Sequence, residues 1–198
     1  MAVLRLMEKW RWEIKQHRGI YLFALFLFFS SVACGYACCE GFDEATRQRL
    51  SESALGAIKD VDAPASFMAL MGSLWHHGKI ASVMVLLGCL PLGAPFVLLC
   101  QGIVGLGTGV LLHTASSAIS GWGIFAVLCY LLPQSLFYVP GYVALCVRAV
   151  RSSIRIFRGV AGNRIDYFVE ILPYLCTIMI GIVIEWCISP RILRLFVA

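Results

Sequence analysis

The chain has 198 residues, of which 60% are apolar and 14% are charged, and its formal net charge is +5. Soluble domains carry about 25% charged residues, so this composition, with a mean hydropathy of +0.85, excludes an ordinary soluble enzyme and indicates an integral membrane protein. The basic excess does not indicate nucleic-acid binding, because ten of the sixteen Lys and Arg residues lie in two segments, 1–19 and 148–168. Such segments beside apolar runs are typical of the cytoplasmic flanks of membrane helices and contact anionic lipid.

The N-terminal segment 1–19 combines basic residues, two tryptophans and apolar residues at helical spacing, which predicts an amphipathic helix on the inner leaflet. Residues 20–39 are expected to form the first span, because about 20 apolar residues are needed to cross the hydrocarbon. A cleavable signal peptide is the alternative, since Ser31-Val32-Ala33 resembles a cleavage site. The long basic flank and the apolar residues that follow favour a retained anchor with a cytoplasmic N-terminus.

Residues 40–78 form the longest stretch between the predicted spans, and six of the eleven acidic residues lie in it. Its position after a span that starts in the cytoplasm places it on the outer side of the membrane. About 40 residues are too few for an independent core, so we expect a contact element or a cap. His76 and His77 predict an interfacial polar patch with Trp75 rather than a metal site, because no complete ligand set lies nearby. No cofactor is indicated.

From Ile80 to Val147 there are 68 residues without a formal charge. At about 20 residues per span, three spans fit. This odd number returns the basic segment 148–167 to the cytoplasm, as the positive-inside rule prefers. We expect a tight inner turn at Gln101-Gly102 and an outer turn at 113–121. The three spans, and a last one after the basic segment, are expected at 80–99, 102–119, 122–147 and 168–188.

The span at 122–147 contains Pro133 and Pro140, each of which removes a backbone donor and clashes with the preceding helical turn. Gln134 adds side-chain polarity at the same depth. Broken backbone in hydrocarbon is tolerated only where protein or water satisfies the freed groups. Segment 133–140 therefore predicts a broken or re-entrant span that faces other helices or a polar cavity. The expected fold is an all-α membrane bundle of about five transmembrane helices with this one irregular span.

Gly105 and Gly109 are four residues apart, a spacing that permits another helix to approach closely. The surrounding run 102–109 could be mistaken for a phosphate-binding loop. It lacks the Lys-Ser/Thr ending of such a loop and lies in a predicted span, so helix packing is the stronger interpretation. The nine cysteines are scattered through apolar runs and do not predict a disulfide framework. Only the neighbouring pair Cys38 and Cys39 merits a test for oxidation.

Glu185 lies near the outer end of the last predicted span. A carboxylate inside a membrane is a functional candidate, but a position near the interface lowers the cost of burial and weakens this inference. Pro190 is expected to end the helix. In the basic segment, arginines at helical spacing predict a stripe that contacts the inner leaflet, with docking of an acidic cytoplasmic partner as the alternative. These arginines are Arg148, Arg151, Arg155 and Arg158.

The order of these features resembles a known family. Its most specific parts are Leu-Leu-Pro-Gln ending at Gln134, Val-Pro ending at Pro140, and a closing Glu-x-x-x-Ser-Pro from Glu185 to Pro190. Over nearly its whole length the chain is similar to the stage II sporulation protein M family of endospore-forming bacteria. Wider relatives often carry His where this chain has Gln134, which favours the sporulation branch. The resemblance implies a multi-pass protein of the mother-cell membrane that is needed when this cell engulfs the forespore.

Members of that family act with stage II sporulation proteins D and P, which degrade peptidoglycan. The resemblance therefore implies a non-enzymatic scaffold that localises these partners, with no catalytic residue to carry over. The uncharged central run agrees, because it offers no convergent pair of ionisable groups for chemistry. The family's spans are also similar to those of type-2 ABC exporter permeases, which keeps open a permease-like subunit coupled to a cytoplasmic ATPase. Homo-oligomerisation stays open.

Overall fold

The computed structural model describes residues 15–46, 48–50, 67–118, 123–160 and 164–187. Within these ranges the chain is helical apart from short turns, and no strand occurs in them, so the predicted all-α fold is confirmed. The long helices are α2 (Arg18–Glu40), α4 (Phe67–Gly88), α5 (Gly93–Ala118), α6 (Gly123–Phe157) and α7 (Arg164–Cys187). Apolar segments form helices because a helix satisfies its backbone hydrogen bonds internally.

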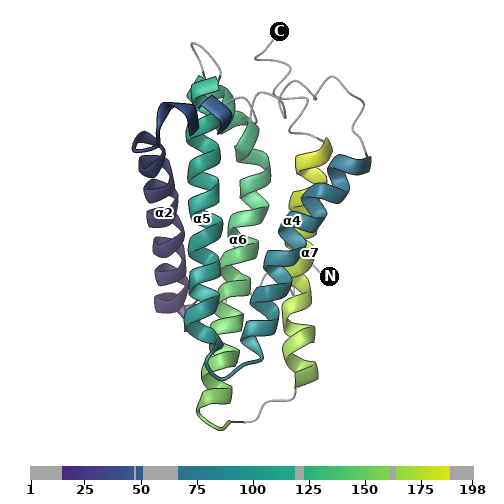
Figure 1. Cartoon of the computed structure of the whole chain (residues 1–198). Helices are drawn as coiled ribbons and strands as arrows, with labels where there is room; N and C mark the ends of the chain where they lie inside the picture. Colours follow the sequence, from purple (N-terminus) through teal and green to yellow (C-terminus); the bar gives the residue numbers. More distant parts are fainter. Residues whose placement is uncertain (1–14, 47, 51–66, 119–122, 161–163, 188–198) are drawn as a thin grey trace.

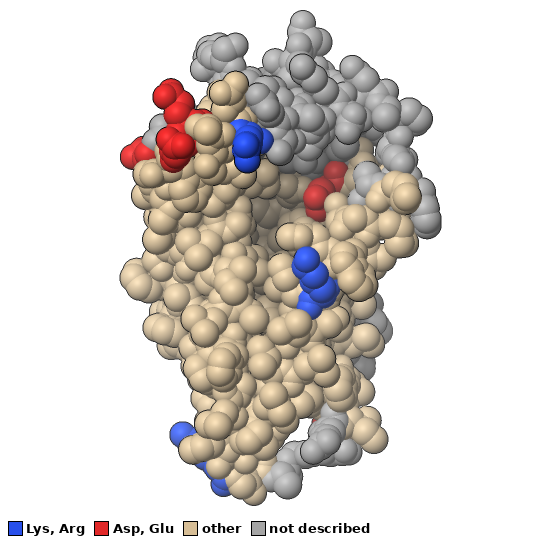
Figure 2. Space-filling view, viewed as in Figure 1, with Lys and Arg blue, Asp and Glu red and all other residues tan. Residues whose placement is uncertain are grey.

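Successive helices run in opposite directions, so the bundle has two distinct ends (Figure 1). One end holds the α4–α5 turn and the connection from α6 to α7, and exposes Arg155 and Arg158. We call it the basic end. The opposite end exposes Glu40, Asp43 and Glu44 at the C-terminal end of α2, and we call it the acidic end. Figure 2 shows most of the red atoms near the acidic end and blue atoms at the basic end, with further blue atoms beside the acidic residues and partway along the mostly tan surface between the ends.

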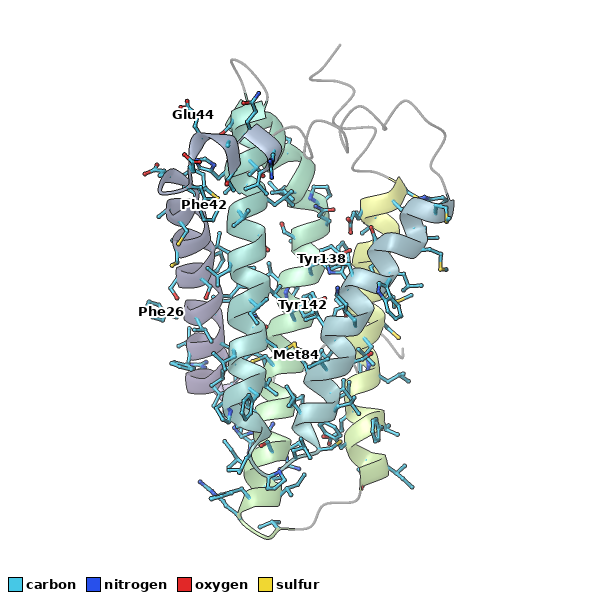
Figure 3. All side chains as sticks on the ribbon, viewed as in Figure 1. Phe26, Phe42, Glu44, Met84, Tyr138 and Tyr142 are labelled. Carbon is cyan, nitrogen blue, oxygen red and sulfur yellow. The ribbon has the colours of Figure 1, made fainter. Side chains whose placement is uncertain are left out.

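Three helical segments are long and apolar enough to cross a membrane by length and composition, namely Arg18–Glu40, Gly93–Ser117 and Ile165–Cys187. Their outward faces carry large apolar side chains, such as Phe26, which is 71% exposed and points away from the bundle (Figure 3). α6 has 35 residues, which is about 52 Å at 1.5 Å per residue. It is therefore longer than the ~30 Å thickness of the hydrocarbon.

α6 is the central helix of the bundle. It packs against α4, α5 and α7, and the ten residues 141–150 are all buried. Tyr142, Leu145 and Cys146 are among the largest side chains with almost no exposed surface. Burial on all sides explains why this stretch is apolar apart from Arg148. The other helices are arranged around it, as Figure 1 shows.

The helix boundaries correct two predictions. α4 begins at Phe67, so the end of the predicted outer segment 40–78 is helical. The predicted span 80–99 is not one helix, because α4 ends at Gly88 and α5 begins at Gly93. The predicted turn at Gln101-Gly102 is wrong, because α5 continues through it and Gln101 is fully buried. The turn instead occupies residues 89–92. Gly93 permits this turn, because a Cβ there would clash with the carbonyl oxygen of Leu87, and Ser153 of α6 bonds the N–H of Ala94 and the carbonyl of Pro91.

The predicted break at 133–140 is not observed, since α6 runs as one helix through both Pro133 and Pro140. Each proline removes one backbone hydrogen bond, whereas unwinding the segment would free several backbone groups in apolar surroundings, each costing several kcal/mol. A continuous helix is therefore the less costly solution. Gln134 is buried at 6% exposure, and Pro140 is exposed on the surface of the bundle.

α2 and α5 approach each other along three glycines. A methyl group on Gly35 of α2 would lie 2.3 Å from the carbonyl oxygen of Leu106 in α5. On α5, a methyl group on Gly105 would lie 2.7 Å from the carbonyl oxygen of Phe28, and one on Gly109 would lie 2.1 Å from that of Val32. Both α5 glycines thus lie where the two backbones are closest, which is the arrangement that small residues permit in membrane helices.

The neighbouring cysteines near the end of α2 do not face each other. Cys39 is buried and its thiol donates to the carbonyl oxygen of Gly35 at 3.4 Å. Cys38 is exposed, and its sulfur lies 4.0 Å from that of Cys34, one helical turn away. The pair that the sequence singled out is therefore separated by the helix geometry, in which adjacent residues point in different directions.

Candidate functional site

A polar cluster lies between α4, α6 and α7, on the side of the bundle nearer the acidic end. We call it the Glu185 cluster, and its members are Ser73, His77, Tyr138, Tyr142 and Glu185. Residues four apart share one face of a helix. This spacing places the first two on one face of α4 and both tyrosines on one face of α6. Figure 3 shows the two tyrosines projecting from α6 toward α4.

Glu185 of α7 is the acceptor at the centre of the cluster. The Ser73 hydroxyl donates to its Oε1 at 3.3 Å, and the Tyr138 hydroxyl donates to its Oε2. The Nε2 of His77 lies 3.5 Å from the same Oε2. The side chains of His77 and Glu185 are 20% and 23% exposed. A largely buried carboxylate is costly unless it is paired and hydrogen-bonded, and all of these partners supply that compensation.

His77 contacts both tyrosines. Its ring stacks on that of Tyr138 with a centroid distance of 4.3 Å and an interplanar angle of 20°. The Tyr142 hydroxyl donates to the backbone carbonyl of His77 at 3.2 Å, and the Nδ1 of His77 lies 3.1 Å from the same hydroxyl oxygen. The ring of His77 therefore contacts both tyrosines of α6 as well as the carboxylate of α7.

Glycine in α7 makes room for this arrangement. A methyl group on Gly181 would lie 3.0 Å from the ring of Tyr138. Gly181 is one helical turn before Glu185, so the tyrosine ring lies across α7 at the level where its hydroxyl can reach the carboxylate. The local sequence of α7 thus supplies both the acceptor and the space for the donor.

A second group of polar contacts lies at the basic end. Arg148 of α6 pairs with Glu170 of α7 at 2.7 Å. Ser153 is fully buried, accepts from the N–H of Ala94 at 2.9 Å and donates to the carbonyl of Pro91 at 3.3 Å. These bonds attach the α4–α5 turn to α6. Arg148 is therefore an interior ion-pair partner, which corrects its predicted place in an exposed stripe.

The arrangement connects three helices. Within the described parts of the chain, no group of three or more His, Cys, Asp and Glu side chains is placed to hold a metal ion. The carboxylate of Glu185 is occupied by partners from two other helices. The geometry is that of a clamp between α4, α6 and α7.

Sequence reasoning identified Glu185 but missed its partners. His77 was expected in an interfacial patch with Trp75, whereas Trp75 is 75% exposed and His77 lies inside the cluster. The signal that could have found the partners is the four-residue spacing of polar groups in two apolar helices, Tyr138 with Tyr142 and Ser73 with His77. Pro190, the other predicted residue of this region, lies outside the described residues.

The long apolar helices and the polar clamp between them define the class of an all-α integral membrane protein. A family model described as Stage II sporulation protein M matches residues 24–198, most of the chain. The chain therefore belongs to the stage II sporulation protein M family, and it is a sporulation-related membrane protein. No curated protein and no solved structure matches it.

Proposed function

We propose that this protein is a non-enzymatic membrane scaffold for forespore engulfment that localises peptidoglycan-degrading partners at the septal membrane. The observation that carries this proposal is the closure of the Glu185 cluster. Its carboxylate is bonded to side chains from two other helices. Both oxygens of this carboxylate accept hydrogen bonds from neighbouring helices, so in the resting bundle it holds α4, α6 and α7 together. A bundle held together in this way is suited to present a fixed surface to partner proteins.

The surface proposed for the partners is the acidic end. The positive-inside rule assigns the basic end to the cytoplasm, which leaves the acidic end on the outer side, where peptidoglycan lies. Residues 41–66 connect α2 to α4 at that end and include the exposed Asp43 and Glu44. We propose stage II sporulation proteins D and P as the partners, because the family acts with them. The family's mother-cell membrane is the proposed location, with the N-terminus in the cytoplasm.

A permease-like subunit coupled to a cytoplasmic ATPase is the second candidate, and one observation favours it. Gln101 is fully buried in α5, and neither its amide oxygen nor its nitrogen has a hydrogen-bond partner among the described residues. An unsatisfied buried group costs about 1–3 kcal/mol. A permease alternates between two packings of its helices. The amide of Gln101 would then find its hydrogen-bond partners in the other packing.

A pull-down from detergent-solubilised sporulating cells distinguishes the two proposed functions. All variants are compared at equal membrane levels. The variants are a 43–62 deletion, Gln101→Leu, and Pro133→Ala/Pro140→Ala as a second change inside the bundle. The scaffold proposal expects the deletion alone to lose both peptidoglycan-degrading partners, and Gln101→Leu to engulf normally. Retention of the partners by every variant, with engulfment stopped by Gln101→Leu, would favour the permease.

A further inference from the structure

We propose that a cavity at the basic end binds the phosphate group of an anionic phospholipid. The cavity has a volume of about 180 Å³ and lies between α6 and α7. Its charged and hydroxyl lining comes from Arg148, Arg151, Ser152 and Arg155 of α6 and from Asp166, Tyr167 and Glu170 of α7. Arg151 and Ser152 each lie three or four residues from Arg148 and Arg155, so these side chains share one side of α6.

The end of α6 gives this cavity its shape. Gly159 has a φ of 72°, and the N–H of Val160 donates to the carbonyl of Arg155 at 3.0 Å. The N–H of Gly159 donates to the carbonyl of Ile156 at 3.0 Å, which completes a Schellman motif. The motif turns the chain back, and Val160 becomes part of the cavity wall. Since the backbone is fixed there, the last arginines of α6 are held at the cavity.

The polar groups of the cavity have unequal roles. Arg148 is 8% exposed and is engaged by Glu170 at 2.7 Å, so this pair joins α6 to α7. Arg155 and Ser152 also line the cavity, and the side chain of neither has a hydrogen bond or ion pair within the described chain. A guanidinium and a hydroxyl on one helix face are suitable donors to phosphate oxygens, because the guanidinium fork matches their geometry.

The charge of the lining favours an anion. Three arginines and two carboxylates line the cavity, so the lining carries a net positive charge. A net positive site prefers a lipid whose headgroup is net negative over a zwitterionic lipid.

The surroundings of the cavity favour a lipid over a soluble phosphate. The apolar membrane-length segment of α7 begins at Ile165, directly before Asp166, so the cavity lies at the level where headgroups meet hydrocarbon. Large apolar side chains are exposed beside the lining residues, with Phe157 67%, Ile165 67% and Phe168 50% exposed. A soluble anion would leave these side chains in water, whereas acyl chains would cover them.

The test measures lipid binding by the full-length protein in neutral detergent micelles, using native mass spectrometry with added phosphatidylglycerol or phosphatidylcholine. Arg155→Gln removes a cavity donor, and Arg158→Gln is the matched control, because Arg158 is equally exposed one turn away but does not line the cavity. Arg151→Gln/Arg155→Gln extends the series. Unfolding temperatures without lipid check that all variants are folded.

We expect wild type to bind phosphatidylglycerol in preference to phosphatidylcholine. Arg155→Gln should weaken phosphatidylglycerol binding about fivefold and the double variant about 25-fold, since each arginine near anionic lipid contributes about a fivefold factor. Arg158→Gln should stay within about twofold. Equal losses in Arg155→Gln and Arg158→Gln would overturn the proposal in favour of diffuse charge attraction. Displacement of the lipid by equimolar inorganic phosphate, or by oligoglutamate, would also overturn it, in favour of a soluble anion or an acidic protein.

Discussion

The imidazole of His77 in α4 pairs with the carboxylate of Glu185 in α7 at 3.5 Å, and the ring of Tyr138 from α6 stacks on that imidazole. This contact thus involves three helices, α4, α6 and α7. In apolar surroundings the carboxylate depends on these partners, because a buried charge without hydrogen bonds is costly.

Glu185→Leu is expected to destabilise the bundle by about 2–3 kcal/mol, because His77 and Tyr138 would each lose a partner that carries charge. Glu185→Gln retains acceptor capacity through its amide oxygen and should cost less. Unfolding of the purified protein in micelles, followed by circular dichroism, measures both. Equal stability of Glu185→Leu and wild type would show that the cluster is not a clamp.

Tyr138→Phe keeps the ring that stacks on His77 and removes only the hydroxyl that donates to Glu185. We expect a loss of about 1.5–3 kcal/mol, the usual range for a hydrogen bond to a charged group. Ser73→Ala removes a longer bond to the same carboxylate, 3.3 Å, and should cost less. If Ser73→Ala is more destabilising than Tyr138→Phe, the Tyr138 hydroxyl is not the stronger donor to Glu185.

Gly109→Ala is expected to destabilise the α2–α5 contact by about 1–3 kcal/mol through overpacking, since its methyl group would lie 2.1 Å from the carbonyl oxygen of Val32. Gly107→Ala is the matched control on the same helix, because a methyl group there meets nothing within 4 Å. The control should be neutral or stabilise by up to about 1 kcal/mol, the helix propensity of Ala over Gly. Thermal unfolding distinguishes them, and a destabilised Gly107→Ala would argue against a packing origin.

Gln101→Leu is expected to stabilise the resting bundle by about 1–3 kcal/mol, because it removes a buried amide without hydrogen-bond partners among the described residues. The matched comparison is Gln134→Leu, at a buried position whose side chain does have a partner. Gln134→Leu should not stabilise. Unfolding in micelles again provides the measurement, and a destabilised Gln101→Leu would show that the amide is satisfied in the membrane.

The helical class follows from the sequence because hydropathy alone distinguishes membrane helices from soluble domains. The closely packed pair Gly105 and Gly109 follows from spacing. Pro91 and Gly93 mark the turn at 89–92 in the sequence, but a count of about 20 residues per span places the boundary too late. The prolines of α6 were overinterpreted, since the loss of single hydrogen bonds does not break a helix in apolar surroundings.

The Glu185 cluster could be predicted only in part. Glu185 is conspicuous as a carboxylate in an apolar helix. Its partner His77 lies in another helix, and no local pattern specifies which helices become neighbours. The same limit applies to Arg148, whose pairing with Glu170 depends on how α6 meets α7. Local spacing shows which residues share a face, and tertiary packing decides what that face contacts.

The central claim, that this protein acts by holding partners in place, is tested most directly by bypassing it. Stage II sporulation proteins D and P would be fused to an unrelated membrane anchor that reaches the septum, in cells that lack this protein, and engulfment would be scored by membrane staining. The account predicts that engulfment is restored once both partners are at the septum. Partners that reach the septum without restoring engulfment would contradict it, because the protein would then do more than localise them.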